Sequence, residues 1–324
     1  MATIHPALTH TSFTPAFPQI QKIAVLTDFS PGAENALRYA ATVARSYGAG
    51  IVLAHAYLPP SCASAAPELA MVVETLNTCR ENLQESLLNA TREPWLKDIH
   101  CTTAVCAGGP ADLLRELTDV DLVVVGTSGA RGFQKALLGS TAETVFRTSS
   151  KPVLTVGPHC VVAENDIPTI GTILCAVDLP PGSPDVIPYA LSLAGRYNAP
   201  LLLLHVLEEP GVLLALEQAC ARAETFEELR KLMPHNAAYE VRTRYVVDFG
   251  NADSAILNEA HMHDAKLIVV GAHRSRVPAL TSRFPGGTAY SVAATAECPV
   301  LTIPRANGLA LGVTDVTESQ QCRE

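Results

Sequence analysis

The sequence is poor in aromatic and charged residues and has no long apolar run. Of its 324 residues, 5% are aromatic and 17% are charged, whereas 48% are hydrophobic. This balance argues against an aromatic-rich β-sandwich and favours helices packed on central strands. No apolar run approaches the ~20 residues that span a membrane, so no membrane contact is expected. Residues 1–20 lack the basic start and apolar stretch of a secretory signal, which predicts a cytoplasmic protein.

Basic residues are also scarce, and no cysteine or histidine motif indicates a metal site. The 23 Lys and Arg residues face 32 acidic ones, a net charge of −9 that disfavours nucleic-acid binding. Nine cysteines without a CxxC motif indicate reduced thiols rather than a disulfide framework. Cys101 and Cys106 fall on opposite faces of a predicted strand. His261 and His263 are two apart on a helical pattern, so they cannot share a metal as i, i+4 histidines would.

The chain repeats itself in order, at an offset of 145 to 150 residues. The matched segments of the first half are 23–28, 51–55, 121–126 and 152–156, and those of the second half are 173–178, 201–205, 266–271 and 299–303. Four matches at nearly one spacing indicate a duplication. The expected organisation is a flexible N-terminus (1–20), domain 1 (21–158), a linker (159–168), domain 2 (169–305) and a flexible tail (306–324).

Each matched segment is a short apolar run, typical of strands buried on both faces of a parallel sheet. Helical patterns lie between them, first at residues 34–45 and again at 185–197. Ser30 and Pro31 are expected to cap and begin the first helix, and Gly48 to end it. We therefore predict an α/β fold in which each half is a doubly wound, Rossmann-like parallel sheet of five strands.

The loop after the fourth strand of the first half has the features of an anion site. Gly126 and Gly129 lack Cβ atoms, so the backbone can turn sharply and approach a phosphate. Residues 139–141 open a predicted helix, whose free N–H groups and positive dipole end favour the same ligand. A glycine-rich loop followed by an ordinary capped helix is the alternative, and the residues themselves leave it open.

The spacing of this loop is Gly, two residues, Gly, nine residues, then Gly-Ser, and it resembles the ATP-binding members of the universal stress protein family. An Asp ending the first strand, a His ending the second and a Pro-Val-Leu in the fifth extend the resemblance to both halves, over about 20–158 and 169–305. It implies a stress-response protein that binds ATP in domain 1 as a regulatory ligand, with Mg²⁺ able to accompany it. The nucleotide-binding residues it implies are Asp28, Ala56, Gly126, Gly129, Gly139, Ser140 and Thr141.

Individual roles follow from this resemblance. Asp28 would contact the adenosine moiety and the backbone of Ala56 the adenine edge, although Asp28 could instead cap the following helix. Arg131 and Lys135 either neutralise phosphate or are solvated. The resemblance does not decide between AMP and ATP. It further implies that the fifth strands pair the two domains about a pseudo-twofold axis, as an intramolecular dimer that could associate further into a homodimer.

The second half departs from the pattern. An arginine replaces the second glycine in Gly271-Ala-His-Arg274, and eleven residues rather than nine separate it from the next glycine. ATP in the familiar pose is not expected there, although the loop is basic enough to hold some anion. The residues of this degenerate second site would be Asp178, Gly271, Arg274, Gly287 and Thr288.

Enzymatic activity is not expected, although slow ATP hydrolysis stays open. The sequence has no P-loop Gly-Lys-Ser/Thr and no Walker-type Asp. Asp28-Phe-Ser-Pro-Gly follows the first strand, where adenine-nucleotide α-hydrolases carry Ser-Gly-Gly-x-Asp-Ser. The alternative function is an interaction scaffold of the same fold that binds no nucleotide. His55 and His205 end apolar strands without a neighbouring partner in sequence, and we interpret them as structural.

Overall fold

The computed structural model describes residues 18–59, 69–127, 138–160, 162, 168–179, 186–208, 215–233, 241–272 and 287–304. Most of both predicted flexible ends lies outside this part of the chain. So do Gly129, Arg131 and Lys135 of the first loop and Arg274 of the second.

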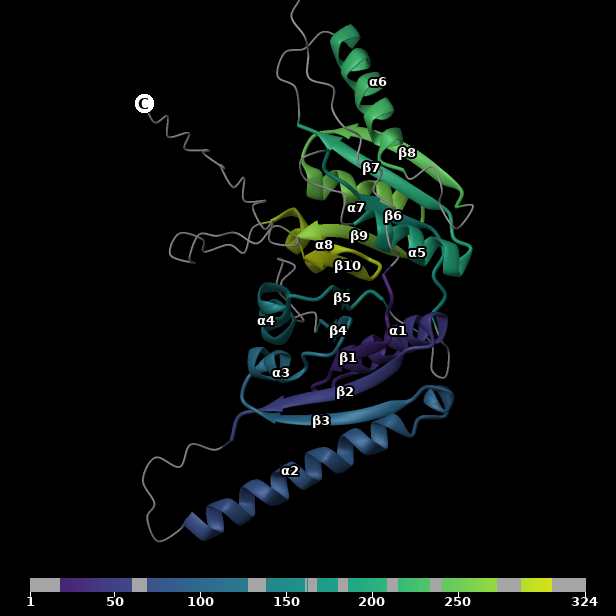
Figure 1. The fold of residues 1–324 in the computed structure, drawn as a ribbon. Coiled ribbons are helices and arrows are strands. Elements are labelled where there is room, and N and C mark those ends of the chain that lie inside the picture. The colour runs from purple at the N-terminus through teal and green to yellow at the C-terminus, as the bar shows by residue number, and fades with distance from the viewer. Residues whose placement is uncertain are drawn as a thin grey trace, which may run out of the picture.

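Ten strands of the two halves form one sheet (Figure 1), in the order β3-β2-β1-β4-β5-β10-β9-β6-β7-β8. The first half contributes β1 (Lys22–Leu26), β2 (Gly50–Tyr57), β3 (Cys101–Ala107), β4 (Leu122–Gly126) and β5 (Val153–Val156). The second contributes β6 (Ile173–Ala176), β7 (Leu201–Leu207), β8 (Thr243–Phe249), β9 (Leu267–Ala272) and β10 (Val300–Pro304). All neighbours are parallel except β5 and β10. The predicted duplicated α/β fold is confirmed.

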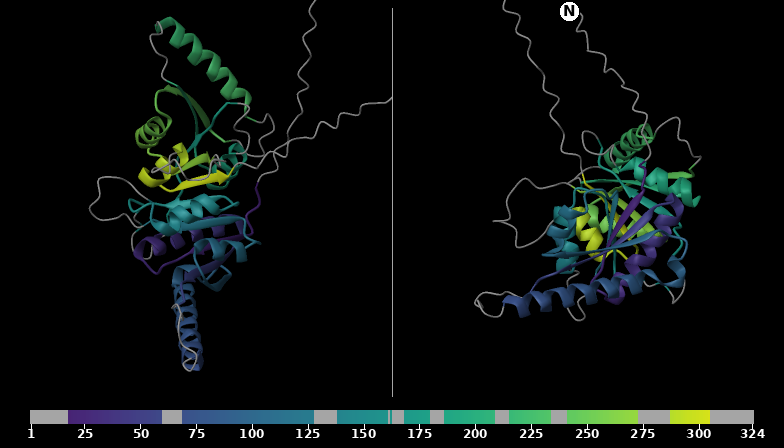
Figure 2. Two further views of the ribbon diagram at one scale, coloured as in Figure 1. Left: turned by 90° about the vertical axis from the view of Figure 1, so that its left-hand side faces the viewer. Right: turned by 60° about the horizontal axis from the view of Figure 1, so that its bottom comes forward.

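Helices cover both faces of the sheet. They are α1 (Pro31–Tyr47), α2 (Leu69–Thr91), α3 (Pro110–Glu116), α4 (Ser140–Thr148), α5 (Ile187–Tyr197), α6 (Ala215–Lys231), α7 (Ala252–Met262) and α8 (Thr288–Thr295), with the short 3₁₀ helix η1 (Pro94–Leu96). Buried residues of α1, α2, α5 and α6 pack on one face, and those of α3, α4, α7 and α8 on the other. The long helices α2 and α6 lie at opposite ends of the sheet (Figure 2). No helix in the described ranges has the length and apolarity that a membrane crossing requires.

Local sequence signals set the ends of α1 as predicted. The Ser30 hydroxyl accepts a hydrogen bond from the Ala33 N–H at 3.2 Å, and Pro31 is the first helical residue. Gly48 ends the helix in the left-handed conformation, with φ of 68°. The equivalent helix, expected from residue 185, begins at Ile187 and ends at Asn198, which is also left-handed.

The two halves share a continuous junction, as expected for an intramolecular dimer. Leu154 of β5 pairs with Leu301 of β10 in the antiparallel step at the centre of the sheet. Beside it, α1 and α5 are joined by polar contacts, with the Tyr47 hydroxyl 2.7 Å from that of Ser192. The Arg196 guanidinium donates to the Ser46 carbonyl at 2.7 Å, and buried residues of both halves form one core on this face.

Two buried threonines at this junction lead to a stability prediction. Thr155 and Thr302 are 1% and 3% exposed, and neither hydroxyl has a hydrogen-bond partner in the described part of the chain. Because an unsatisfied buried hydroxyl destabilises a fold, Thr155→Val should raise the free energy of unfolding by about 1 kcal/mol. Urea denaturation followed by circular dichroism measures the change.

Thr42→Val is the matched control for this experiment. The Thr42 hydroxyl is also buried, but it lies 2.9 Å from the Pro168 carbonyl and donates to it. The same substitution there removes a satisfied bond and should lower stability by about 1 kcal/mol. Equal effects at the two positions would contradict the assignment of an unsatisfied hydroxyl at Thr155.

The cysteines of the described ranges are all unpaired thiols. Cys101 packs with the α1 and α2 side of the sheet and Cys106 with the α3 and α4 side, so the prediction of opposite faces is confirmed. Burial, reinforced by the hydrogen bond from the Cys106 thiol to Glu116, raises the pKa of that thiol to about 11. Cys106 is therefore protonated at neutral pH and a poor nucleophile.

Candidate functional site

The carboxyl ends of β2, β1 and β4 meet at the topological switch point of the first half. Leu26 of β1 pairs with Ala54 on one side and Val125 on the other. Two residues beyond these pairs, Asp28 therefore lies between Ala56 and the residue that follows Gly126. Ligands of doubly wound sheets bind at this point, because the crossovers leave a crevice there. The fold thus brings three of the implied nucleotide residues to one place.

Asp28 is exposed at this edge and shapes its own turn. Its Oδ1 accepts a hydrogen bond from the Ser30 N–H at 3.0 Å. The side chain that caps α1 is that of Ser30, so the alternative interpretation of Asp28 as the helix cap is wrong. The carboxylate is left facing solvent at the end of β1.

Phe29 is a feature of this edge that the sequence did not predict. Its φ of 61° lies in the left-handed region, which bulky side chains seldom adopt, and its ring stays 43% exposed. The Phe29 N–H donates to the Thr27 hydroxyl at 3.0 Å, and its ring centroid lies 5.0 Å from that of His55. A strained backbone that presents an aromatic ring at a switch point is the kind of feature that marks functional sites.

The two repeated histidines hold the backbone at equivalent places. His55 Nδ1 lies 2.7 Å from the Thr27 carbonyl, and His205 Nδ1 lies 2.7 Å from the Val177 carbonyl. A carbonyl only accepts, so Nδ1 carries the proton in each ring. The strand β2 runs two residues beyond His55, to Tyr57, rather than ending at the histidine as predicted. These contacts agree with the structural interpretation of both rings.

Gly126 is required by packing as well as by any ligand. A Cβ at this position would lie 2.3 Å from the Gly32 carbonyl oxygen and 2.9 Å from the Ala33 nitrogen. Such distances are impossible for real atoms, so only glycine lets β4 end against the first turn of α1. The sequence pattern attributed this glycine to phosphate access alone, and the contact with α1 is a second, sufficient reason.

The first turn of α4 closes the same edge. Gly139 is its N-cap, with φ of −60° and ψ of 157°, and no side chain caps it within the described residues. The predicted helix start is confirmed, with Ser140 exposed and the Glu143 N–H bonded to the Gly139 carbonyl at 2.8 Å. The acidic Glu143 is paired with Arg147 at 2.8 Å. The turn thus keeps unbonded N–H groups and a positive dipole end.

The second half has a similar edge with different details. Asp178 is exposed at the end of β6, and Gly287 is the N-cap of α8, whose first residue is Thr288. At Gly271 a Cβ would meet Val186 Cγ1 at an ordinary 3.4 Å and no other atom of the described residues. The residue after Asp178 is a leucine outside the left-handed region, so the described residues of this half hold no counterpart of Phe29.

A parallel sheet, repeated twice, with a topological switch point and a helix start beside it defines a class of duplicated α/β proteins. The chain belongs to the universal stress protein family, whose model matches residues 19–157 and 169–304. A universal stress protein of Mycolicibacterium smegmatis is 27% identical over 296 residues, which cover 87% of this chain and 96% of that protein.

Some solved structures match most of this chain and others less than half of it. The crystal structure of a universal stress protein from Archaeoglobus fulgidus has a TM-score of 0.62 at 17% identity and covers 89% of this chain and 100% of that one. A structure of a universal stress protein from Archaeoglobus fulgidus in complex with dAMP covers 41% of this chain and 96% of that one, at 21% identity and a TM-score of 0.29.

Proposed function

We propose that the chain binds an adenine nucleotide, ATP foremost, in its first half as a regulatory ligand in the cytoplasmic stress response. The observation that carries the proposal is the convergence of Asp28, Ala56 and the uncapped first turn of α4 on one switch point. A carboxylate can accept from ribose hydroxyls, strand backbone can read an adenine edge, and a free helix start suits phosphates. Membership of the family and the glycine spacing of the loop support the same ligand.

Phe29 extends the proposed site. Its exposed ring lies beside Asp28 and against His55, which limits its motion on one side. Aromatic faces stack well on nucleobases. The left-handed backbone of Phe29 is strained, and strained conformations are found mostly at functional sites. We therefore place the adenine of the bound nucleotide near this ring.

The proposed ligand acts by being bound, not by being turned over quickly. The residues assigned to the site include no histidine, glutamate or lysine placed to take a proton from water beside a phosphate. Mg²⁺ would accompany the phosphates as a counterion. Nucleotide occupancy would then bias the conformation or partner choice of the chain.

Asp28 and Asp178 provide a matched test, because they occupy equivalent places after β1 and β6. Asp28→Ala should weaken ATP binding about tenfold, since one charge-assisted hydrogen bond to the ribose is lost. Asp178→Ala should leave the affinity unchanged. Equilibrium titration with a fluorescent ATP analogue measures both.

Mass spectrometry of gently purified protein distinguishes the alternative function. A retained adenine nucleotide at about one per chain supports the proposal. A wild-type chain that retains none and does not bind added ATP would instead be an interaction scaffold. Equal losses of affinity in the two aspartate variants would place the nucleotide somewhere other than the first switch point.

A further inference from the structure

The amino-terminal edge of the second half holds a hollow of about 640 Å³, remote from both switch points. It lies where β6, β7 and β8 begin and where α7 ends. Its walls include Thr172, Pro200, Leu202, Arg242, Arg244 and His263. Its volume falls within the range of small-molecule sites, about 300–1,000 Å³.

The hollow has a cationic side and an apolar side. Arg242 and Arg244 are two residues apart on an extended segment, so both side chains leave the same face. Leu202 pairs with Arg244 across β7 and β8, so the two side chains share a face, but Leu202 is only 2% exposed and the half-buried Pro200 supplies the apolar surface. In a chain with a net charge of −9, two neighbouring arginines in a hollow stand out from their background.

Neither guanidinium is neutralised by the described part of the chain. The third basic side chain at the hollow is His263. Its Nε2 lies 3.3 Å from Oε2 of Glu259, so this ring already contacts a carboxylate. Lys266 and Asp264 form their own ion pair at 2.5 Å. Among the described residues, the two arginines therefore stand at the wall of the hollow without an acidic partner.

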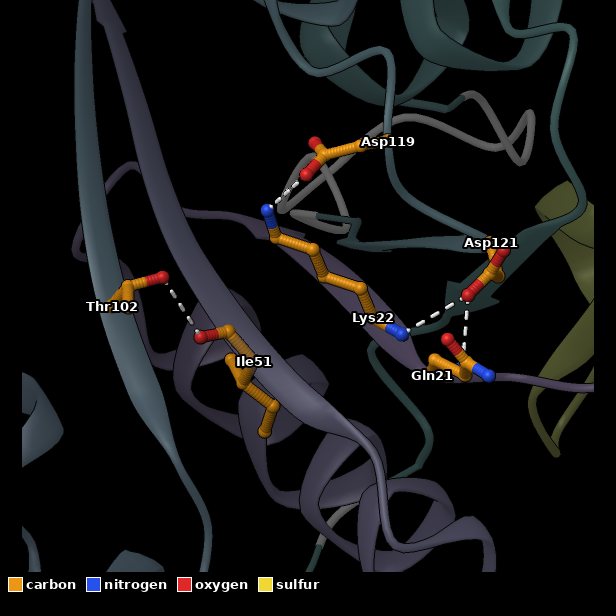
Figure 3. A network of polar contacts seen from close by, with 6 residues as sticks. All are labelled: Gln21, Lys22, Ile51, Thr102, Asp119 and Asp121. Carbon is orange, nitrogen blue, oxygen red and sulfur yellow. Dashed lines mark hydrogen bonds and ion pairs between the residues drawn. The ribbon is translucent and has the colours of Figure 1, made fainter.

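The equivalent place in the first half carries polar contacts between its own residues (Figure 3). There Lys22 reaches Asp119 at 2.5 Å, while Asp121 accepts from the backbone N–H groups of Gln21 and Lys22. The Thr102 hydroxyl donates to the Ile51 carbonyl on the neighbouring strand.

The backbone identifies the replacements in the second half. Asp121 N–H donates to the Lys22 carbonyl and Lys266 N–H to the Thr172 carbonyl, both at 2.8 Å, so Thr172 stands where the first half has Lys22. The strand registers place Arg244 where the first half has Thr102. Threonine in place of Lys22 shortens the side chain at this edge. Arginine in place of Thr102 adds a positive charge.

We propose that this hollow is a second binding site, for a small organic anion that joins a phosphate or carboxylate group to an apolar body. The two guanidiniums take the oxyanion, because their planar N–H groups match its oxygens, and the half-buried Pro200 contacts the apolar part. The site lies at the opposite edge of the sheet from the nucleotide and does not depend on it.

Phenyl phosphate, phenylacetate and benzyl alcohol test the proposal as probes at millimolar concentration, by saturation-transfer NMR on the full chain. At least one anion should bind, and the neutral alcohol should not. The double variant Arg242→Gln/Arg244→Gln should bind that anion at least about tenfold more weakly. Whichever of the two anions binds more tightly shows whether the site prefers phosphate or carboxylate.

Arg80→Gln/Arg92→Gln is the matched control, because it removes the same charge from exposed positions, one on α2 and one just after its end. It should bind the anion as the wild type does. Absence of binding to the wild type, persistence of binding in the Arg242/Arg244 variant, or equal loss in both double variants would each overturn the proposal. ATP affinity measured on the same variants should be unchanged, so this result and that for the nucleotide site are separable.

Discussion

Gly126→Ala is expected to lower the free energy of unfolding by about 3 kcal/mol, a large effect for one methyl group. The added Cβ would lie 2.3 Å from the carbonyl oxygen and 2.5 Å from the carbonyl carbon of Gly32. Both atoms belong to backbone, so no side chain can rotate away, and β4 or the start of α1 must shift. Urea denaturation followed by circular dichroism measures the loss.

Gly271→Ala is the control in the second half. Among the described residues, the new Cβ there would meet a valine methyl group at 3.4 Å, which is an ordinary contact, and the stability should change by less than about 1 kcal/mol. Similar losses in the two variants would show that the approach of β4 to α1 is not the reason for glycine at position 126.

This contact changes how a variant of Gly126 should be interpreted. A glycine in a phosphate-loop pattern invites the conclusion that any loss of nucleotide binding reports a lost ligand contact. Because Asp28 lies just before the start of α1, a shift of the first turn of that helix would disturb the proposed site indirectly. Loss of ATP binding in Gly126→Ala therefore says little about whether Gly126 touches the ligand.

The sequence predicted those parts of the fold that depend on neighbours along the chain. Apolar runs predicted the strands, and Ser30 and Gly48 predicted the ends of α1, because caps act over a few residues. The repeat, together with the family resemblance, predicted that β5 and β10 would meet. The switch point followed in turn, since the connection rules for parallel strands leave few orders to choose from.

Features that depend on contacts between distant segments were not predicted. The left-handed Phe29 reflects the fit of its ring against His55, which lies on another strand. The clash between a Cβ at position 126 and Gly32 exists only once β4 is placed beside α1. The hollow lined by Arg242 and Arg244 forms only where the starts of β6, β7 and β8 and the end of α7 come together. Sequence spacing carries no signal for any of these.

The roles of the nucleotide residues themselves stay predictions. Asp28, Ala56, Gly126, Gly139, Ser140 and Thr141 lie at one edge of the sheet, whereas Gly129 lies outside the described residues. The geometry suits a nucleotide, and it is the binding of ATP that has to be measured.

Ser140→Pro is expected to weaken ATP binding by about 2 kcal/mol, or about thirtyfold, while α4 stays intact. Ser140 is the first residue of the helix, where proline is favoured and its missing N–H breaks no helical bond. Gly139 already has the extended conformation that a residue before proline adopts, with ψ of 157°. The substitution therefore removes one N–H and one hydroxyl from the proposed phosphate site and leaves the fold in place.

Two further variants locate the effect. Thr288→Pro makes the same change at the first residue of α8, after a Gly287 that is also extended, and should leave ATP affinity unchanged. Ser140→Ala keeps the N–H, so its smaller loss isolates the contribution of the hydroxyl. Calorimetric titration with ATP and with AMP should show a larger loss for ATP, because the start of α4 is proposed to hold phosphates and AMP has only one. If Ser140→Pro binds ATP as tightly as the wild type and unfolds at the same urea concentration, the helix start does not hold the phosphates, and the proposed pose is wrong even where Asp28 still matters.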